Sequence, residues 1–255
     1  MGTFLDTVVE EIRGDLVERM TATPAAELEA AIGPAPRGRP FSEALIGEGI
    51  SLIAEMKRAS PSKGPIRPDA TVEDIVTAYE RAGARACSVL TEERHFGGGL
   101  ADLRAARAAV DIPLLRKDFI VDRYQLLEAR AAGADAALLI VAALGGTALG
   151  EMMSAAAELG LDALVEVHSE AEVEAAVDSG AEVIGINNRD LQSLEVDLDT
   201  TFRRLADVPA GTVVVAESGI TTPGDVRALE DAGVDAILVG EALMTAPDTA
   251  RAVED

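Results

Sequence analysis

The sequence predicts an α/β fold: a single (β/α)8 barrel, or TIM barrel, preceded by an N-terminal helical extension. Eight short apolar runs recur along the chain, and an amphipathic segment follows each of them. The runs cover residues 51–56, 86–90, 113–116, 136–141, 163–167, 183–186, 212–216 and 236–239. Continuous apolar runs are typical of parallel strands, which are buried on both faces.

A near-repeat supports this prediction. The segments RAGARACSVL, AAGADAALLIV, DSGAEVIGIN and DAGVDAILVG each place a glycine between a helical pattern and a strand. These glycines are Gly83, Gly133, Gly180 and Gly233, where a left-handed C-cap is expected. Eight units without a GxGxxG fingerprint favour a closed barrel over an open doubly wound sheet.

The first 45 residues differ from the rest of the chain. Residues 4–20 have apolar side chains at helical spacing, a shorter helix is expected after Pro24, and residues 33–40 read as a Pro/Gly/Arg-rich linker. We therefore expect residues 1–45 to form an extension packed on the barrel, and residues 46–255 to form the barrel itself.

Composition limits the function classes. The 255 residues are 48% hydrophobic and 26% charged, with a net charge of −23, which argues against nucleic acid as a partner. No apolar run approaches the length of a membrane span, and the acidic N-terminus does not resemble a signal peptide. Cys87, the single cysteine, lies in an apolar run. We expect a cytoplasmic protein, and a monomer because no exposed apolar stripe stands out.

Lysine is scarce in this sequence. Only Lys57, Lys63 and Lys117 are lysines among 22 basic residues. Abundant acid with arginine in place of lysine suggests adaptation to high salt. The remaining lysines are expected to do something that arginine cannot, because an ammonium can give up a proton and a guanidinium effectively cannot.

Polar residues recur where the predicted strands end. Barrels build their active sites at the carboxyl ends of their strands, so these side chains should share one rim. They are Glu55, Lys57, Lys117, Glu166, Asn187, Arg189, Glu217, Ser218, Gly240 and Glu241. A shared position near one axis predicts an acid–base cluster with mutually tuned pKa values.

The same segments resemble indole-3-glycerol-phosphate synthases in order and spacing. They are AEMKRASPSKG (54–64), SVLTEERHFGGG (88–99), LLRKDFI (114–120), LVEVH (164–168), IGINNRDL (184–191), AESGI (216–220) and LVGEALM (238–244). The resemblance covers roughly residues 45–245. Glycine stands at 97–99 where the family commonly has a serine, and the extension lacks tryptophan.

The resemblance implies a sugar-phosphate substrate, 1-(2-carboxyphenylamino)-1-deoxyribulose 5-phosphate. It also implies a decarboxylating, dehydrating ring closure that belongs to tryptophan biosynthesis and uses no cofactor. We expect Lys117 to be the general acid and Lys57 a second acid, each with a pKa lowered by burial or by the other amine. Glu166 is the expected general base.

Other residues are expected to support these groups. Glu55 would orient both lysines, Glu217 would support the polar network, although an ion pair between loops is an alternative, and Asn187 would bind a sugar hydroxyl. The phosphate is expected at Ser218, Gly219, Gly240 and the backbone amide of Glu241.

The remaining predictions concern the lid and the ring. Ser60 and Lys63 would lie in a lid over the phosphate or the ring, with Phe96 and Phe119 as walls for the ring. Arg189 would bind the substrate carboxylate, or else pair with an acid such as Asp190. His95 and His168 lack a third ligand for zinc, so no metal site is expected, and we assign both to solvated or capping roles.

Two other enzyme classes and one non-enzyme remain open. A Schiff-base aldolase barrel also needs a rim lysine and a phosphate site. A phosphoribosyl-type isomerase barrel would lack the paired lysines. A catalytically inactive barrel scaffold would have no need of lysines in a chain that is otherwise depleted of them.

Overall fold

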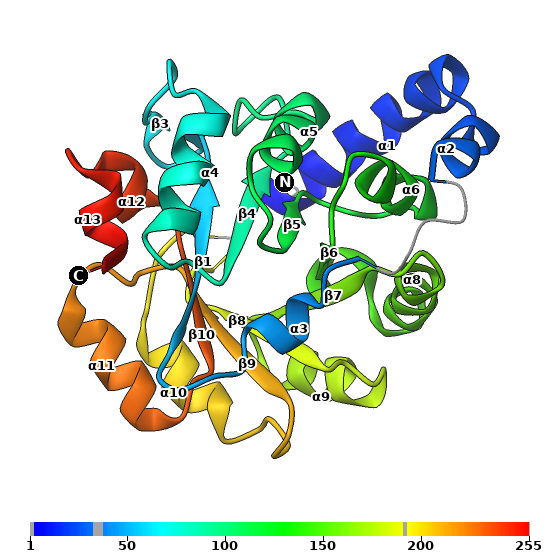
Figure 1. Cartoon of the computed structure of the whole chain (residues 1–255). Helices are drawn as coiled ribbons and strands as arrows, with labels where there is room; N and C mark the ends of the chain where they lie inside the picture. The colour runs from blue at the N-terminus through cyan, green and yellow to red at the C-terminus, as the bar shows by residue number, and fades with distance from the viewer. Residues whose placement is uncertain (1–2, 33–37, 191–192, 255) are drawn as a thin grey trace.

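Eight parallel strands close into a barrel in the computed structural model, which describes residues 3–32, 38–190 and 193–254. The hydrogen-bonded order is β1-β10-β9-β8-β7-β6-β5-β4, with β4 pairing back to β1 (Figure 1). The strands are β1 (Ser51–Met56), β4 (Ala86–Leu90), β5 (Leu114–Lys117), β6 (Ala136–Ile140), β7 (Asp162–Val167), β8 (Val183–Asn187), β9 (Val213–Glu217) and β10 (Ala236–Val239). The predicted (β/α)8 barrel is confirmed.

Helices surround this barrel (Figure 1). Those that follow the strands are α4 (Val72–Arg81), α5 (Leu100–Ala109), α6 (Arg123–Ala131), α7 (Val141–Leu144), α8 (Gly146–Glu158), α9 (Glu170–Asp178), α10 (Asp199–Leu205), α11 (Pro223–Ala232), α12 (Glu241–Thr245) and α13 (Thr249–Glu254). Before the barrel lie α1 (Phe4–Ala22), α2 (Ala25–Ile32) and α3 (Phe41–Ala44). Within the described ranges, no helix is long and apolar enough to cross a membrane.

Each predicted run coincides with one strand, with ends that differ by at most one residue. Lys117, Asn187 and Glu217 are consequently the last residues of β5, β8 and β9 rather than the first residues of the following loops. A hairpin of two-residue strands, β2 (Ala59–Ser60) and β3 (Gly64–Pro65), was not predicted. Strands this short carry no alternation of apolar and polar residues that a pattern could reveal.

The repeated glycine joints have the predicted backbone conformation. Gly83, Gly133, Gly180 and Gly233 have φ of 99°, 93°, 78° and 92°. The aspartate two residues after two of these glycines caps a neighbouring strand, because its carboxylate accepts the backbone N–H of the strand's first or second residue. These pairs are Asp135 with Leu114 at 2.9 Å and Asp235 with Val214 at 2.8 Å. Similar sequences therefore make the same strand junction at two places in the barrel.

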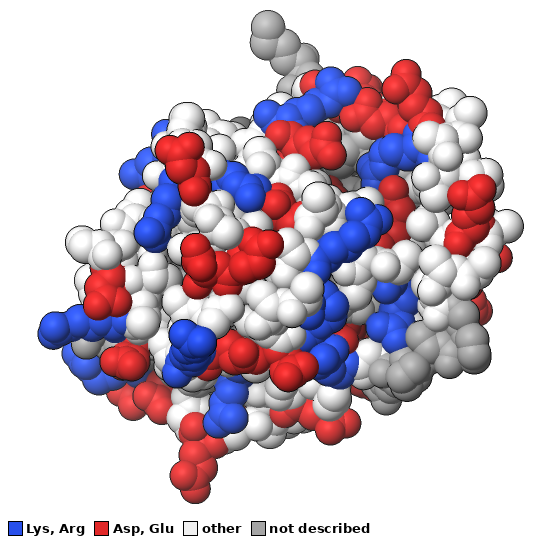
Figure 2. Space-filling model, turned by 45° about the horizontal axis from the view of Figure 1, so that its top comes forward, with Lys and Arg blue, Asp and Glu red and all other residues white. Residues whose placement is uncertain are grey.

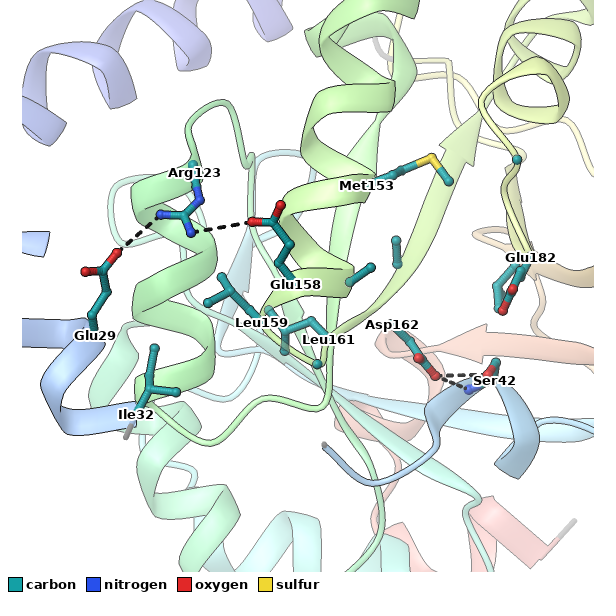
Figure 3. Close-up of a pocket in the computed structure, with 15 residues that line it drawn as sticks. Glu29, Ile32, Ser42, Arg123, Met153, Glu158, Leu159, Leu161, Asp162 and Glu182 are labelled. Atoms are coloured by element: carbon teal, nitrogen blue, oxygen red, sulfur yellow. Dashed lines mark hydrogen bonds and ion pairs between the residues drawn. The ribbon is translucent and has the colours of Figure 1, made fainter. Parts of the chain in front are cut away.

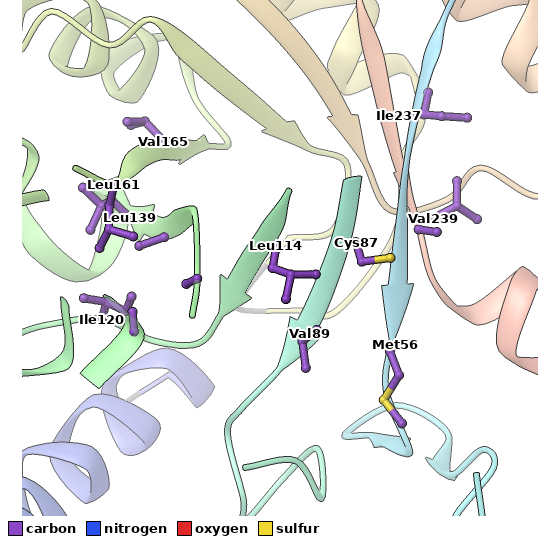
Figure 4. Close-up of a cluster of buried hydrophobic side chains, with 14 of the residues drawn as sticks. Met56, Cys87, Val89, Leu114, Ile120, Leu139, Leu161, Val165, Ile237 and Val239 are labelled. Carbon is purple, nitrogen blue, oxygen red and sulfur yellow. The ribbon is translucent and has the colours of Figure 1, made fainter. Parts of the chain in front are cut away.

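The apolar core has two parts. One lies between the strands and the outer helices and includes Met56, Cys87, Val89 and Leu114 (Figure 4). Burial raises the pKa of the Cys87 thiol to about 12, so this cysteine behaves as a core residue. The other part joins the inward side chains of the strands to Leu5, Val8, Ile12 and Leu16 of α1.

The N-terminal helices pack on the barrel. The Arg19 Nε donates to Glu128 Oε1 of α6 at 2.9 Å, and the Tyr124 hydroxyl donates to the carbonyl oxygens of Arg19 and Thr23. At the opposite end of the barrel, Ser42 of α3 donates to the Asp162 carboxylate at the start of β7. Residues 33–37 of the predicted linker lie outside the described residues.

A buried ionic network fixes the strand that ends at Lys117. Arg116 is fully buried and its side chain pairs with Asp118 at 2.7 Å and with Glu128 at 3.3 Å. Its Nη1 also donates to the Gln125 carbonyl at 2.6 Å. Neighbouring side chains on a strand point to opposite faces, so this network holds β5 against α6 while Lys117 points to the other side.

Charged side chains are spread over the surface. On the face in Figure 2, acidic groups lie among basic ones and do not collect into one patch. With a net charge of −23, this surface repels itself at low ionic strength.

Replacement of Arg116 by leucine should lower the free energy of unfolding by at least about 3 kcal/mol, because Asp118 would lose the cation that compensates its buried charge and Glu128 would keep only Arg19. Urea unfolding measures the change. The exposed Arg104→Ala on α5 is the control and should alter stability by less than about 0.5 kcal/mol. Equal midpoints for Arg116→Leu and wild type would contradict the role given to the network.

Candidate active site

A cavity of about 740 Å³ opens at the carboxyl ends of the strands. All fifteen site residues predicted from the sequence line it: Glu55, Lys57, Ser60, Lys63, Phe96, Lys117, Phe119, Glu166, Asn187, Arg189, Glu217, Ser218, Gly219, Gly240 and Glu241. They come from strands that are distant in sequence, and barrel closure brings them to one place. All three lysines of the chain are among them.

Lys117 lies between two buried carboxylates. Its Nζ is 3.2 Å from Glu166 Oε2 and in direct contact with Glu217 Oε2. The Asn187 Nδ2 donates to Glu166 Oε1 at 3.0 Å. Three successive strands, β7, β8 and β9, thus supply the groups that surround the amine of β5.

Lys57 forms a second ion pair at the same mouth. Its Nζ is 2.7 Å from Glu55 Oε1, as expected because Lys57 directly follows β1 and lies two residues after Glu55, so that both side chains point the same way. Glu55 was expected to orient both lysines. The structure pairs it with Lys57, while its charge acts on Lys117 from a greater distance.

Two glycines make room for these carboxylates. A Cβ on Gly185 would lie 2.2 Å from Glu217 Oε1, and one on Gly240 would lie 2.4 Å from Glu55 Oε1. Gly240, predicted as an anion-binding backbone group, thus also leaves the space that the Glu55 carboxylate occupies. The sequence analysis missed Gly185, although a glycine inside the apolar strand VIGIN is a signal of close approach.

The electrostatics of Lys117 contradict the sequence prediction. Burial by itself would lower the pKa of this amine, but the charges of Glu217, Glu166 and Glu55 outweigh burial and raise the pKa above its ordinary value. For Lys117 the expected lowering by a second cation is wrong, because carboxylates surround its amine. Lys117 is held as an ammonium ion.

The two carboxyl groups beside Lys117 differ from each other. Burial, together with the charge of Glu166, raises the pKa of Glu217 to about 7 against the attraction of Lys117. Glu166 is equally buried, yet Lys117, His168 and the amide of Asn187 lower its pKa. One carboxyl is therefore ready to hold a proton near neutrality and the other stays ionised, a division typical of acid–base sites.

Backbone groups suited to an anion lie after β9 and β10. Ser218 and Gly219 have φ of 66° and 82°, and the Asn188 side chain fixes this turn by donating to the Ser218 carbonyl at 3.0 Å. Ser218 is one of only two non-glycine residues with positive φ in the described chain, so its turn is strained. Lys63, expected over the phosphate or ring, is 3.3 Å from the Glu241 carboxylate.

Three aromatic rings form one wall of the cavity. The centroids of Phe96 and Phe119 are 6.4 Å apart, and Phe4 of α1 lies 6.4 Å from Phe119. Phe4 was not predicted as a site residue because it belongs to the extension, far from the barrel in sequence. Arg189, at the same cavity, donates from Nη1 to the Leu194 carbonyl at 3.0 Å.

Neither histidine is simply solvated. His95 Nε2 is 3.0 Å from Glu11 of α1, and its ring packs edge-on against Phe4. His168 lies between Glu166 and Glu172, 3.4 and 3.3 Å away. Solvated and capping roles are therefore wrong descriptions of both. Among the described residues, no three His, Cys, Asp or Glu side chains are placed to hold a metal ion.

A second cavity, of about 720 Å³, lies at the opposite end of the barrel (Figure 3). Its lining includes Arg123, which pairs with Glu29 at 3.4 Å and Glu158 at 3.7 Å, and Asp162, which accepts from Ser42. Arg123 is thus neutralised by two glutamates and Asp162 is hydrogen-bonded by Ser42, and none of the predicted site residues lines this cavity.

The closed parallel barrel and the amine–carboxylate cluster at its carboxyl mouth define a (β/α)8-barrel enzyme. A sequence profile described as indole-3-glycerol phosphate synthase matches residues 5–255. The chain belongs to the indole-3-glycerol phosphate synthase family.

Proteins of that name are close in sequence. The protein of Streptomyces griseus is 51% identical to this chain over 226 residues, which are 89% of this chain and 84% of that protein. The protein of Mycobacterium avium is 49% identical over 226 residues, which are 89% of this chain and 83% of that protein. That of Nocardioides sp. is 53% identical over 225 residues, 88% of this chain and 86% of its own.

Two solved structures share the fold at low identity. 3-Hexulose-6-phosphate synthase from Salmonella typhimurium superposes with a TM-score of 0.65 and 17% identity, over 80% of this chain and 97% of that one. Thiamine phosphate pyrophosphorylase from Pyrococcus furiosus superposes with a TM-score of 0.59 and 22% identity, over 80% of this chain and 92% of that one. At such identities the likeness concerns the barrel alone.

The raised pKa of Glu217 predicts how stability depends on pH. The folded protein keeps this proton up to about pH 7, whereas the unfolded chain releases it near the ordinary carboxyl value of 4.5. The resulting stabilisation is complete below about pH 4.5 and is lost as pH rises to 7. Relative to Glu217→Gln, wild type should lose on the order of 3 kcal/mol between pH 4.5 and 8 in urea titrations. A difference that grew with pH would have the wrong sign.

Proposed function

We propose that this chain is an indole-3-glycerol-phosphate synthase that acts on 1-(2-carboxyphenylamino)-1-deoxyribulose 5-phosphate. The products are indole-3-glycerol phosphate, CO2 and water, in tryptophan biosynthesis. The observation that carries the proposal is the position of the Lys117 ammonium between Glu166 and Glu217 at the barrel mouth, in a chain of this family.

Ring closure needs an acid. As the aryl carbon attacks the ketone, its oxygen gains negative charge and takes a proton from Lys117. The raised pKa of Lys117 does not prevent this, because it keeps the amine protonated and the alkoxide that forms is a stronger base than an amine. Glu217, whose pKa of about 7 lets it carry a proton, lies in contact and can reprotonate the amine.

The later steps need a second acid and a base. Loss of CO2 from the ring carbon restores the aromatic electrons, and the new hydroxyl then leaves as water after a proton from Lys57 reaches it. Glu166 removes the last proton and completes the indole. Its lowered pKa keeps it ionised for that task, and Asn187, which holds Glu166 Oε1, also reaches the cavity to bind a sugar hydroxyl. Glu55 positions Lys57.

The remaining cavity residues bind the substrate in this proposal. The phosphate lies at the backbone of Ser218, Gly219, Gly240 and Glu241, with Ser60 and Lys63 above it on the β2–β3 hairpin. The aromatic ring lies against Phe96 and Phe119, with Phe4 added from α1. Arg189 meets the substrate carboxylate.

A Schiff-base aldolase has less support. A lysine nucleophile must lose its proton before it attacks a carbonyl. The carboxylates around Lys117 favour the opposite state. An acid role therefore suits this amine better than a nucleophilic one.

Lys117→Ala and Lys57→Ala should each lower the rate of indole-3-glycerol phosphate formation by at least about a hundredfold. Lys117→Arg should be nearly as damaging, because it keeps the charge without a transferable proton. Product fluorescence at molar KCl follows the reaction, and the exposed Arg227→Ala serves as the control. A lysine adduct trapped by borohydride with a ketose phosphate would instead support the aldolase.

We also propose that the enzyme works as a cytoplasmic monomer in a high-salt environment, and that residues 1–45 are an extension of the barrel domain of residues 46–255. Supporting observations are the net charge of −23, the absence of lysine outside the cavity, and the ion pairs and apolar contacts that join α1 to the barrel.

High salt should stabilise the folded chain, because salt screens the repulsion among its acidic groups. The free energy of unfolding should rise by more than about 1 kcal/mol between dilute buffer and molar KCl. Thermal and urea unfolding at several KCl concentrations measure this effect. Full stability in dilute buffer, with no further gain on adding salt, would contradict the adaptation.

A further inference from the structure

Asn188 connects the turn after β9 to the start of α10. It follows Asn187, the last residue of β8, and only 1% of it is exposed. Its Oδ1 accepts the backbone N–H of Thr201 at 3.0 Å and the Thr201 hydroxyl at 2.9 Å. Because a backbone N–H can only donate, the oxygen of this amide faces α10 and its NH2 group faces Ser218. Both the position and the orientation of the Asn188 amide are thus fixed.

Two donors of Asn188 hold consecutive carbonyl groups of the turn. Its backbone N–H donates to the Glu217 carbonyl at 2.9 Å, and its Nδ2 donates to the Ser218 carbonyl at 3.0 Å. A trans peptide is planar, so its C=O and N–H point to opposite sides. The bond to the Ser218 carbonyl therefore directs the N–H of Gly219 away from Asn188. Among the described residues, Ser218 and Gly219 line the cavity and Asn188 does not.

The Gly219 N–H is available to a ligand. In the part of the chain that the structure describes, no acceptor takes it. Gly219 has no side chain to cover this group, and any other residue would be strained there, since φ is 82° and a Cβ would lie 2.6 Å from Val196 Cγ1. Backbone N–H groups presented in this way by turns are typical ligands of phosphate oxygens.

The backbone conformation of Ser218 is unfavourable by itself. Its φ of 66° lies in the left-handed region, where a residue with a Cβ is disfavoured. The turn therefore needs a hold from outside, and the Asn188 amide supplies one at the carbonyl of the strained residue. Without this bond we expect Ser218 to relax toward negative φ and to change the direction of the Gly219 N–H.

We propose that Asn188 is a positioning residue for phosphate binding, which aims the Gly219 N–H at the substrate phosphate by holding Ser218 in its strained conformation. The inference rests on the function proposed above, which places the phosphate at this turn. Asn188 acts through the backbone of Ser218 and does not touch the substrate. Because the phosphate is remote from the reacting carbons, loss of this contact should raise KM and leave kcat nearly unchanged.

Asn188→Ala tests the inference. It should raise the Kd of inorganic phosphate and the KM of the substrate about tenfold, as expected for the loss of one hydrogen bond that serves a charged group. The value of kcat should change by less than about twofold. Calorimetric titration with inorganic phosphate gives Kd, and initial rates give KM and kcat. If Asn188→Ala does not fold, Asn188→Ser replaces it, because one hydroxyl can accept from Thr201 but cannot also reach Ser218.

Two backgrounds at Ser218 separate backbone orientation from packing. Ser218→Gly removes the strain, because glycine adopts positive φ readily, whereas Ser218→Ala keeps the strain and removes only the hydroxyl. In the Ser218→Ala background, Asn188→Ala should again weaken phosphate binding about tenfold. In the Ser218→Gly background, the same change should weaken it by less than about threefold.

Three outcomes would overturn the inference. An unchanged Kd in Asn188→Ala would mean that the turn binds phosphate without help from Asn188. Equal losses in the two Ser218 backgrounds would mean that Asn188 acts through packing. A wild type that binds no inorganic phosphate would remove the anion site itself. A wild type that binds phosphate but forms no indole-3-glycerol phosphate would instead reject the proposed function, and the phosphate titrations would still test Asn188.

Discussion

The contact between the Lys117 ammonium and the carboxyl groups of Glu166 and Glu217 constrains the rest of this structure. Three ionisable groups are buried at one point, and a buried charge is costly unless it is paired. The amine compensates one full negative charge, so the two carboxyls cannot both ionise freely. Glu166 takes the lower pKa and Glu217 the higher one, and the acid–base capacity of the site follows from that division.

The surrounding fold keeps these groups in place. The Arg116 network ties the strand that carries Lys117 to α6, and Arg19 ties α6 to the N-terminal helix. Gly185 leaves the space that the Glu217 carboxyl occupies. The second, inward part of the core joins the same helix to the barrel interior, so the extension that brings Phe4 to the cavity is anchored by ionic and apolar contacts together.

Proteins that share only the barrel with this chain differ strongly from it in sequence, whereas relatives of its own family do not. Two barrels with other names superpose over 80% of the chain at 17% and 22% identity, whereas relatives of the indole-3-glycerol phosphate synthase family are about half identical. A barrel needs only apolar strands and helix faces, which many sequences satisfy. The segments by which the sequence resembles the family lie at the strand ends, where the cavity opens.

The sequence by itself determined the eight strands and the left-handed glycine joints, because strand periodicity and strand ends are local properties. Strand ends and the family resemblance together also predicted fifteen of the residues that line the cavity. Only the tertiary structure decided which groups meet. It placed carboxylates around Lys117 and so reversed the expected direction of its pKa, brought Phe4 from the extension to the cavity, and set His168 beside Glu166. A pKa depends on the distances to charges on other strands, and barrel closure fixes those distances.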